Sequence, residues 1–170
     1  QHTVPLCVHQ CLCVTEYSEP LVKAAIKENK FSTNPFAAQL LGGVVERWAT
    51  NVDTDTTLFV PVPLSSRREH ERGHNQVTTV LQQVSSITIN TRLLTKTRHT
   101  PPQTTLTRSE RRNNLTQAFT YSGKKLPDHI KTVVLVDDVL TTGATMKAAR
   151  ATLAPHLPPH VKLICLALAH

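Results

Sequence analysis

Aromatic residues are scarce in this chain. Phe, Tyr and Trp together make up 4% of its 170 residues, with a single Trp, a single Met and five Gly. Most of the few aromatic residues stand at apolar, periodic positions, so the sequence offers little support for a platform on which a nucleobase stacks. The pocket for a base is therefore not readable from the residue pattern.

Long hydrophobic runs are also missing. The longest, such as residues 164–169 and 133–136, are far too short to cross a bilayer core of roughly 30 Å. The first eight residues lack the basic-then-apolar order of a secretory signal. We therefore expect a cytoplasmic protein without membrane insertion, and the length favours a single domain over residues 1–170.

Acidic residues are outnumbered by basic ones. Lys and Arg total 19 against 12 Asp and Glu, a formal net charge of +7, and the excess clusters at residues 67–72 and 96–112. Such a field predicts an anionic partner, but it attracts a small polyphosphate and a nucleic-acid backbone alike. A solvated basic face is the alternative for both clusters.

Cysteines raise the question of a zinc site. Cys7, Cys11 and Cys13 lie near His2 and His9, but their C-x-x-x-C-x-C spacing offers no second pair of ligands. The pattern favours ordinary thiols in a buried strand or loop. We therefore assign no metal ligand.

Hydrophobic periodicity predicts alternating strands and helices. We expect strands at residues 11–17, 57–63, 131–136 and 161–169, and helices from residue 20 and at residues 35–48, 76–84 and 145–153. The second helix has an apolar stripe that we expect to be buried, formed by Phe36, Leu40, Leu41, Val44, Val45 and Trp48. Residues 65–75 are expected as a polar loop and residues 93–115 as a long mobile loop. The βαβ unit after residue 131 implies a parallel sheet with ligands at the carboxyl ends of its strands.

One segment carries most of the chemical information. Residues 133–145 read V-V-L-V-D-D-V-L-T-T-G-A-T, a buried strand that ends in Asp137 and Asp138, followed by a hydroxyl-rich turn and a helix start. Carboxylates at a strand end can accept hydrogen bonds from ribose hydroxyls, and a helix amino terminus can hold a phosphate. In the structural alternative, the acids cap a turn and Thr145 caps the helix. The length of the pattern favours a binding site.

This segment resembles the phosphoribosyl pyrophosphate motif of type I phosphoribosyltransferases. Two further elements, R-x-x-x-x-R-G-x-N-Q at residues 67–76 and R-x-T-P-x-Q at residues 98–103, are similar to the ComF family of competence-associated, phosphoribosyltransferase-like proteins. The resemblance covers about residues 14–169. It implies an α/β type I phosphoribosyltransferase fold, in which helices flank a parallel sheet with a small hood and a mobile loop. ComF proteins often begin with a cysteine-rich zinc ribbon, and we find none among these residues.

The resemblance also implies a set of site residues. Asp137 and Asp138 would bind the ribose hydroxyls. The 5′-phosphate would be held by Thr141, Thr142, Gly143, Ala144 and Thr145. The pyrophosphate side would be formed by Leu64, Ser65, Ser66, Arg67 and Arg68, and the mobile loop would contribute Arg98, His99 and Arg108. His74 and His99 are candidate proton shuttles or plain surface histidines. No catalytic residue is identified.

The function implied is that of a cytoplasmic protein that binds phosphoribosyl pyrophosphate or a nucleotide. It would help to handle single-stranded DNA during natural transformation, alongside DNA-uptake proteins. Mg²⁺ would enter with the substrate pyrophosphate. The alternatives are a phosphoribosyltransferase of nucleotide metabolism or salvage and a regulatory protein that binds the ligand without turnover. Thr141 stands where many purine-salvage relatives carry an acid, which makes purine salvage less attractive.

All three functional hypotheses share one expectation about the acid pair. Replacing Asp137 and Asp138 with Asn should abolish ribose phosphate binding. We expect the fold to survive, because acids at a solvent-facing strand end contribute little to a core.

Overall fold

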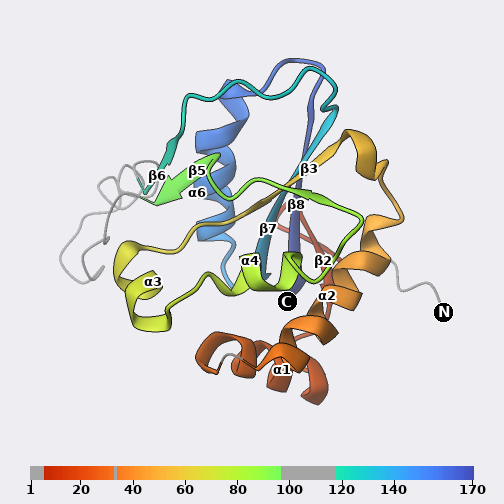
Figure 1. Ribbon diagram of the computed structural model, residues 1–170, viewed down its shortest axis with the longest axis vertical. Helices are drawn as coiled ribbons and strands as arrows, with labels where there is room; N and C mark the ends of the chain where they lie inside the picture. The colour runs from red at the N-terminus through yellow and green to blue at the C-terminus, as the bar shows by residue number, and fades with distance from the viewer. Residues whose placement is uncertain (1–5, 33, 97–117) are drawn as a thin grey trace.

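A six-stranded sheet forms the centre of the computed structural model, which describes residues 6–32, 34–96 and 118–170 (Figure 1). Its order is β1-β2-β8-β7-β3-β4. The bounds are β1 Leu6–Val8, β2 Cys11–Thr15, β3 Thr57–Pro61, β4 Thr88–Ile89, β7 Thr132–Val139 and β8 Lys162–Ala169. All neighbouring strands pair in parallel except β1, which runs antiparallel to β2 at the edge. The predicted parallel sheet is thereby confirmed.

The two central strands are apolar on both faces. Val133 and Val136 in β7 and Leu166 in β8 have no exposed surface. A parallel strand that helices cover on both sides takes this continuous apolar form rather than an alternating one. β7 runs three residues beyond the predicted end at residue 136, so it contains both acids.

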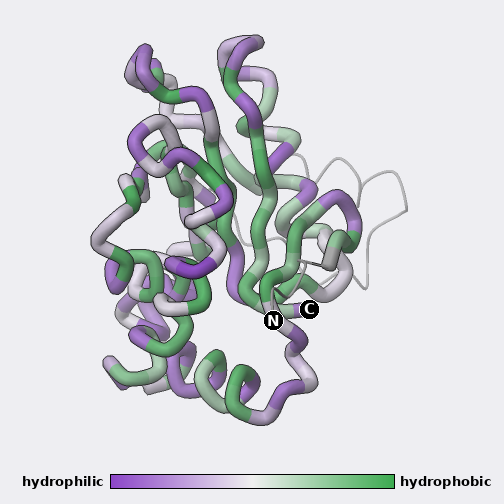
Figure 2. Tube along the Cα trace, turned by 90° about the vertical axis from the view of Figure 1, so that its right-hand side faces the viewer, coloured by the Kyte–Doolittle hydropathy of each residue, from purple (hydrophilic) through white to green (hydrophobic). Residues whose placement is uncertain are grey.

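Helices cover both faces of the sheet. The bounds are α1 Pro20–Phe31, α2 Pro35–Ala49, α3 Ser66–Arg72, α4 Gln76–Leu81 and α6 Ala144–Leu153, with short 3-10 turns at Thr54–Thr56 and Ala154–His156. One core joins α1, α2 and α4 to Val134 and Val136 of β7. The other joins Val133 and Leu135 to α6 and to a small antiparallel sheet of β5 (Leu94–Lys96) and β6 (Phe119–Tyr121). Hydrophobic strands run between helices of mixed character in Figure 2. None of the described helices is long and apolar enough to cross a membrane.

The helix α2 turns a different face to the core than the predicted stripe. Leu41, Val45 and Trp48 are buried as expected, but Phe36 is 77% exposed and Leu40 is 42% exposed. Successive helix residues are rotated by about 100°. Ala37 lies in line with Leu41, and Phe36 is therefore turned away from the sheet.

The polar run at residues 65–75 was expected to be a loop but contains the helix α3. The Ser65 hydroxyl accepts a hydrogen bond from the Arg68 backbone N–H at 3.4 Å, and Gly73 ends the helix with φ at 74°. These are ordinary start and stop signals. We missed the helix because none of its residues is buried, so no apolar period marks it.

Candidate ligand-binding site

Several segments of the chain meet at the carboxyl edge of the parallel strands. Residues 62–68 follow β3, residues 140–145 follow β7, and α1 begins soon after β2 ends. Because parallel strands end at the same edge, these segments lie in the same region, in the lower half of the molecule in Figure 1. Ligands of open parallel sheets bind at this edge.

The turn between β7 and α6 forms a small pocket with one of the two acids. Its volume is about 30 Å³, and Asp137 and residues 139–146 line it. Thr141, Thr142 and Thr145 are exposed, and the Thr142 hydroxyl accepts a hydrogen bond from the Ala144 backbone N–H at 3.4 Å. The structure therefore brings the five predicted phosphate-binding residues together with Asp137.

Asp137 and Asp138 point to opposite faces of the sheet. Successive strand residues alternate between faces, so Asp137 follows Val133 and Leu135 toward the α6 side, and Asp138 follows Val134 toward α1 and α4. Our expectation that both acids face solvent is wrong. Asp138 is 8% exposed, and Asp137 is only partly exposed.

Asp138 is held by two side chains from distant parts of the chain. Its Oδ2 accepts a hydrogen bond from Gln76 Nε2 at 3.0 Å and lies 2.9 Å from Lys30 Nζ. Its Oδ1 accepts a hydrogen bond from the Val139 backbone N–H at 2.6 Å. Exposed ion pairs contribute about 0–1 kcal/mol. This pair is largely shielded, so replacing Asp138 with Asn should cost more stability than we expected from the sequence.

Asp137 has an unusual affinity for its proton. Burial raises its pKa to about 7, and the negative charge of Asp138 acts in the same direction. The hydrogen bond from the Asp138 backbone N–H, 2.9 Å from Asp137 Oδ1, and the charges of Lys30 and Lys96 oppose the increase. Near neutral pH this carboxyl group therefore exchanges between its neutral and charged forms.

The predicted phosphate-binding turn at residues 141–145 (the phosphate turn) contacts the tip of the β1–β2 hairpin. His9 and Gln10 both have positive φ, at 50° and 63°, as a two-residue type I′ turn requires. Gly143 also has a positive φ of 70°, and a Cβ placed there would lie 3.3 Å from His9 Cβ. Arg150 of α6 donates a hydrogen bond to Gln10 Oε1 at 2.5 Å. The hairpin thus contacts both the turn, through His9, and the helix that follows it, through Gln10.

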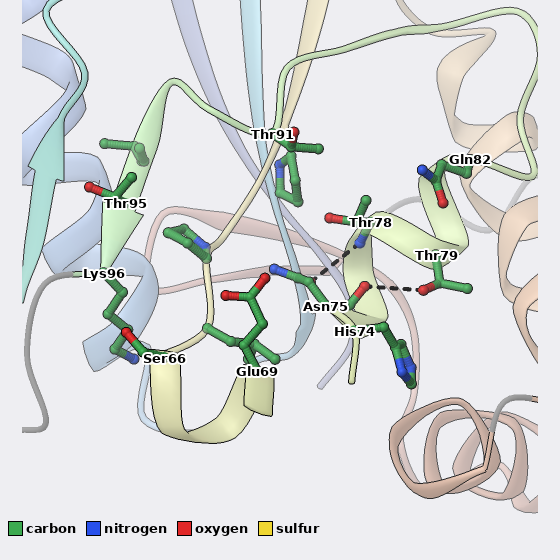
Figure 3. Close-up of a pocket in the computed structure, with 14 residues that line it drawn as sticks. Ser66, Glu69, His74, Asn75, Thr78, Thr79, Gln82, Thr91, Thr95 and Lys96 are labelled. Atoms are coloured by element: carbon green, nitrogen blue, oxygen red, sulfur yellow. Dashed lines mark hydrogen bonds between the residues drawn. The ribbon is translucent and has the colours of Figure 1, made fainter. Parts of the chain in front are cut away.

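The predicted pyrophosphate-side residues lie at the start of α3. Leu64 and Ser66 line an open cleft of about 580 Å³ between β3, α3, α4 and β5, together with Glu69 and Lys96 (Figure 3). Burial lowers the pKa of Lys96, and the nearby positive charge of Arg68 adds to the effect. Neither acid of the pair lines this cleft, but the charge of Lys96 in its wall acts on Asp137.

The remaining predicted site residues are held by contacts within the protein or lie outside the described residues. Ser65 is buried and caps α3, and Arg67 forms an exposed ion pair with Glu71 at 2.6 Å. The ring nitrogens of His74 lie 2.9 Å from the Arg72 carbonyl and 3.0 Å from the Asn29 carbonyl, which ties this histidine to the backbone of two elements. The mobile-loop residues Arg98, His99 and Arg108 lie outside the described residues.

Cysteines occupy the first hairpin and the last strand. Cys11, Cys13 and Cys165 are buried, as expected for small apolar side chains, whereas Cys7 is exposed. Burial raises the pKa of Cys11, which disfavours the thiolate that binds metals. Among residues 6–32, 34–96 and 118–170, no three His, Cys, Asp or Glu side chains gather closely enough to hold a metal ion.

Sequence reasoning missed the role of Lys30 and Gln76. Gln76 ends the R-x-x-x-x-R-G-x-N-Q element, which we used only to identify a family. That element was a usable signal, because a Gln that is followed by Val77 and buried with it is a poor choice for packing alone. Lys30 carried no signal, since α1 also contains Lys23 and Lys27.

Comparisons with known proteins agree with the fold. A family model described as "Phosphoribosyl transferase domain" matches residues 57–170. DNA utilization protein YhgH of Escherichia coli O157:H7 is 32% identical over 161 residues, which is 90% of this chain and 69% of the relative. Competence protein F of Haemophilus influenzae is 38% identical over 91 residues, which is 52% of this chain and 40% of the relative. A solved hypoxanthine phosphoribosyltransferase from Staphylococcus aureus aligns with a TM-score of 0.43 and 13% identity over 84% of this chain and 69% of its own, a likeness too distant to argue from.

Proposed function

Because this chain belongs to the ComF family of phosphoribosyltransferase-like proteins, we propose that it binds the ribose 5-phosphate part of phosphoribosyl pyrophosphate or of a nucleotide. The observation that carries the proposal is the pocket in which Asp137 meets residues 139–146. The Asp137 carboxylate would accept a hydrogen bond from a ribose hydroxyl. The threonine hydroxyls and the first backbone N–H groups of α6 would hold the phosphate, which the helix dipole also favours.

Mg²⁺ would accompany the pyrophosphate rather than occupy a protein site of its own. Mg²⁺ keeps several waters and usually binds through one or two carboxylates plus substrate phosphates. The described residues offer carboxylates near the turn but no cluster of three ligating side chains. They fit an ion of this kind. Bound to the pyrophosphate, it would neutralise part of the charge, and the basic side chains of Arg68 and Lys96 would add to this.

Calorimetric titration with phosphoribosyl pyrophosphate and Mg²⁺ tests the proposal. We expect saturable binding by the unchanged chain and a loss of at least tenfold in Asp137→Asn, because a hydrogen bond to a charged group is worth about 1.5–3 kcal/mol. Asp128→Asn is the matched control, since Asp128 is exposed and lies before β7, at the opposite edge of the sheet. Equal binding by both variants, or none by the unchanged chain, would contradict the proposal. Pyrophosphate release that depends on an added base would favour the phosphoribosyltransferase reading.

We further propose that the protein handles single-stranded DNA during natural transformation, as the names of its competence and DNA-utilization relatives suggest. Two exposed aromatic rings support this proposal. Phe31 ends α1 and Phe36 lies in the first turn of α2, and each is 77% exposed. Arg72 lies 5.6 Å from the centre of the Phe31 ring. Proteins that bind single strands combine such rings with a positive field, here a net charge of +7.

Fluorescence anisotropy with a labelled oligothymidylate tests this second proposal. The double variant Phe31→Ser with Phe36→Ser should bind at least tenfold more weakly, because stacking contributes about 1–3 kcal/mol per base. Leu21→Ser with Leu40→Ser is the control, since it removes exposed apolar side chains of the same two helices without removing a ring. Affinity should also fall steeply with salt. Binding that is insensitive to salt, or equal in both double variants, would overturn the idea.

A further inference from the structure

Two elements converge on Asp138 from outside its own strand. Lys30 comes from the last turn of α1, and Gln76 is the first residue of α4. Their side chains contact the same oxygen, Asp138 Oδ2, at 2.9 Å and 3.0 Å. Lys30 is 22% exposed in its side chain and Gln76 is 4% exposed, so water competes little for these contacts.

The same elements are tied to each other and to the end of β3. Asn29 Nδ2 donates a buried hydrogen bond to the Gln76 carbonyl at 2.9 Å. Asn75 Nδ2 donates to the Val62 carbonyl at 3.0 Å, and Asn75 Oδ1 caps α4 by accepting from the Val77 N–H. The G-x-N-Q turn therefore fixes where the Gln76 amide stands relative to β3 and β7.

Stability alone does not account for the glutamine at this position, although its Nε2 satisfies the Asp138 carboxylate. Gln76 Oε1 is buried and has no hydrogen-bond partner among the described residues. A buried acceptor without a partner is destabilising, and Met would fill a similar volume without that cost. Residues that break a packing rule of this kind are expected at functional sites.

We propose that Lys30 and Gln76 are positioning residues of the ligand site, which fix the Asp138 carboxylate so that it binds a ribose hydroxyl together with Asp137. A carboxylate has about four acceptor positions. Three are used by Lys30, Gln76 and the Val139 N–H, which leaves about one for a ligand, on Oδ1. This inference rests on the proposed ribose phosphate site and adds to it the residues that orient one of its acids.

Two small ligands separate the effect of the acids from that of the phosphate turn. Methyl phosphate probes the turn alone, whereas ribose 5-phosphate probes the turn and the acids. Lys30→Met and Gln76→Met should each lower affinity for ribose 5-phosphate about tenfold and leave affinity for methyl phosphate unchanged. Lys27→Met is the control, because Lys27 is an exposed lysine on the same helix. General damage to the fold would instead weaken the binding of both ligands.

The pH dependence gives a second readout. The charges that act on Asp137 are those of Asp138, of Lys30 from α1 and of Lys96 from β5, and Asp137 in turn acts on the buried Cys11 thiol. The charge of Lys30 lowers the pKa of Asp137, so Lys30→Met should move the midpoint of ribose 5-phosphate binding to higher pH. Lys30→Arg keeps the charge and should restore the profile. The ratio of the affinities for the two ligands is compared at each pH, because the titration of the phosphate group affects both affinities alike.

The outcomes distinguish this inference from the proposal on which it rests. If the unchanged chain binds neither ligand, the ribose phosphate site is wrong and the positioning role falls with it. The second outcome is that the unchanged chain binds ribose 5-phosphate more tightly than methyl phosphate. If Lys30→Met and Gln76→Met then keep both this preference and the pH midpoint of binding, the positioning role alone is overturned. Should Lys30→Met fail to fold, Lys30→Gln removes the charge while keeping a polar side chain, and Gln76→Glu replaces Gln76→Met in the same way. Gln76→Glu places a second negative charge at Asp138 and should then reduce the ribose preference.

Discussion

At the scale of single residues, the two adjacent acids show how strand geometry divides a motif. Neighbouring residues in a strand point to opposite faces of the sheet. Asp137 therefore lines the pocket at the phosphate turn, whereas Asp138 contacts Lys30 and Gln76 on the other face. Burial and the neighbouring negative charge raise the pKa of Asp137 to about 7. Asp137 therefore changes its charge near neutral pH, whereas the carboxylate of Asp138 is held in place by its partners.

The raised pKa of Asp137 predicts a pH-dependent stability. An unfolded Asp has a pKa of about 3.9, so between about pH 4 and pH 7 the folded chain binds a proton that the unfolded chain does not. This contribution to stability is complete below about pH 4 and is lost as the pH rises through 7. Asp137→Asn cannot titrate, and its melting temperature relative to the unchanged chain should therefore increase by several degrees from pH 5 to pH 8.

Thermal unfolding at pH 5, 6, 7 and 8 measures this difference. Asp128→Asn serves as the reference, because the hydrogen bond and charge of Lys125 lower the pKa of Asp128. That group is fully charged over the whole range, so its variant should differ from the unchanged chain by a constant amount. Parallel pH curves for Asp137→Asn and the unchanged chain would rule out a raised pKa.

At the scale of elements, α2 shows how close packing depends on small residues. Gly42 and Gly43 are neighbours in the same helix but meet different surroundings. A Cβ at Gly42 would lie 2.6 Å from Gln83 Cβ, whereas nothing described lies within 4 Å of a Cβ at Gly43. Gly42 therefore lets the segment after α4 approach α2, and Gly43 has no such role.

The two glycines predict opposite effects of alanine. Gly43→Ala should raise the free energy of unfolding by about 0.5–1 kcal/mol, because Ala loses less backbone freedom than Gly in a helix. Gly42→Ala gains the same helix propensity, but its methyl group forces α2 and Gln83 apart. We therefore expect its free energy of unfolding to fall by about 1–3 kcal/mol in total. Urea unfolding of both variants measures the difference. An equal stabilisation by both would mean that the contact with Gln83 relaxes freely.

At the scale of the whole molecule, the site draws on both faces of the sheet. The phosphate turn and Asp137 belong to the side of α6, and the partners of Asp138 belong to the side of α1 and α4. A ligand that contacts both acids would bridge the two cores. Because it binds only the folded chain, it should stabilise the whole fold rather than one helix.

Ligand binding is therefore predicted to raise the melting temperature. Ribose 5-phosphate at a hundred times its dissociation constant adds about 2.7 kcal/mol. For a chain of this size, that corresponds to roughly 5–10 °C. Differential scanning calorimetry in buffer free of phosphate measures the shift, and Asp137→Asn should show less of it at the same ligand concentration. An unchanged melting temperature at saturating concentrations would contradict the proposed site.

Local patterns were enough to predict the parts of the candidate site that are contiguous in the chain. The apolar run before Asp137, the turn at residues 141–145 and the helix α6 follow from local patterns, because strand and helix periods and a Gly at a tight turn are local properties. The parallel sheet followed from the order of these elements. The loop predicted over residues 93–115 was wrong at its start, because Leu94–Lys96 form β5 and Leu93 and Leu94 are buried. The mobile-loop assignment at Arg98, His99 and Arg108 remains a prediction.

The side chains that surround the acids come from distant parts of the chain and could not be predicted from local patterns. Gln76 is 62 residues away from Asp138 along the chain, and Lys30 is farther still. A periodic pattern shows which residues of a helix are apolar, but not which element packs against them or how the helix is rotated. For that reason the exposed rings of Phe31 and Phe36, the helix α3 and the contacts of Lys30 were not visible in the sequence. They depend on how separate elements pack against a shared sheet.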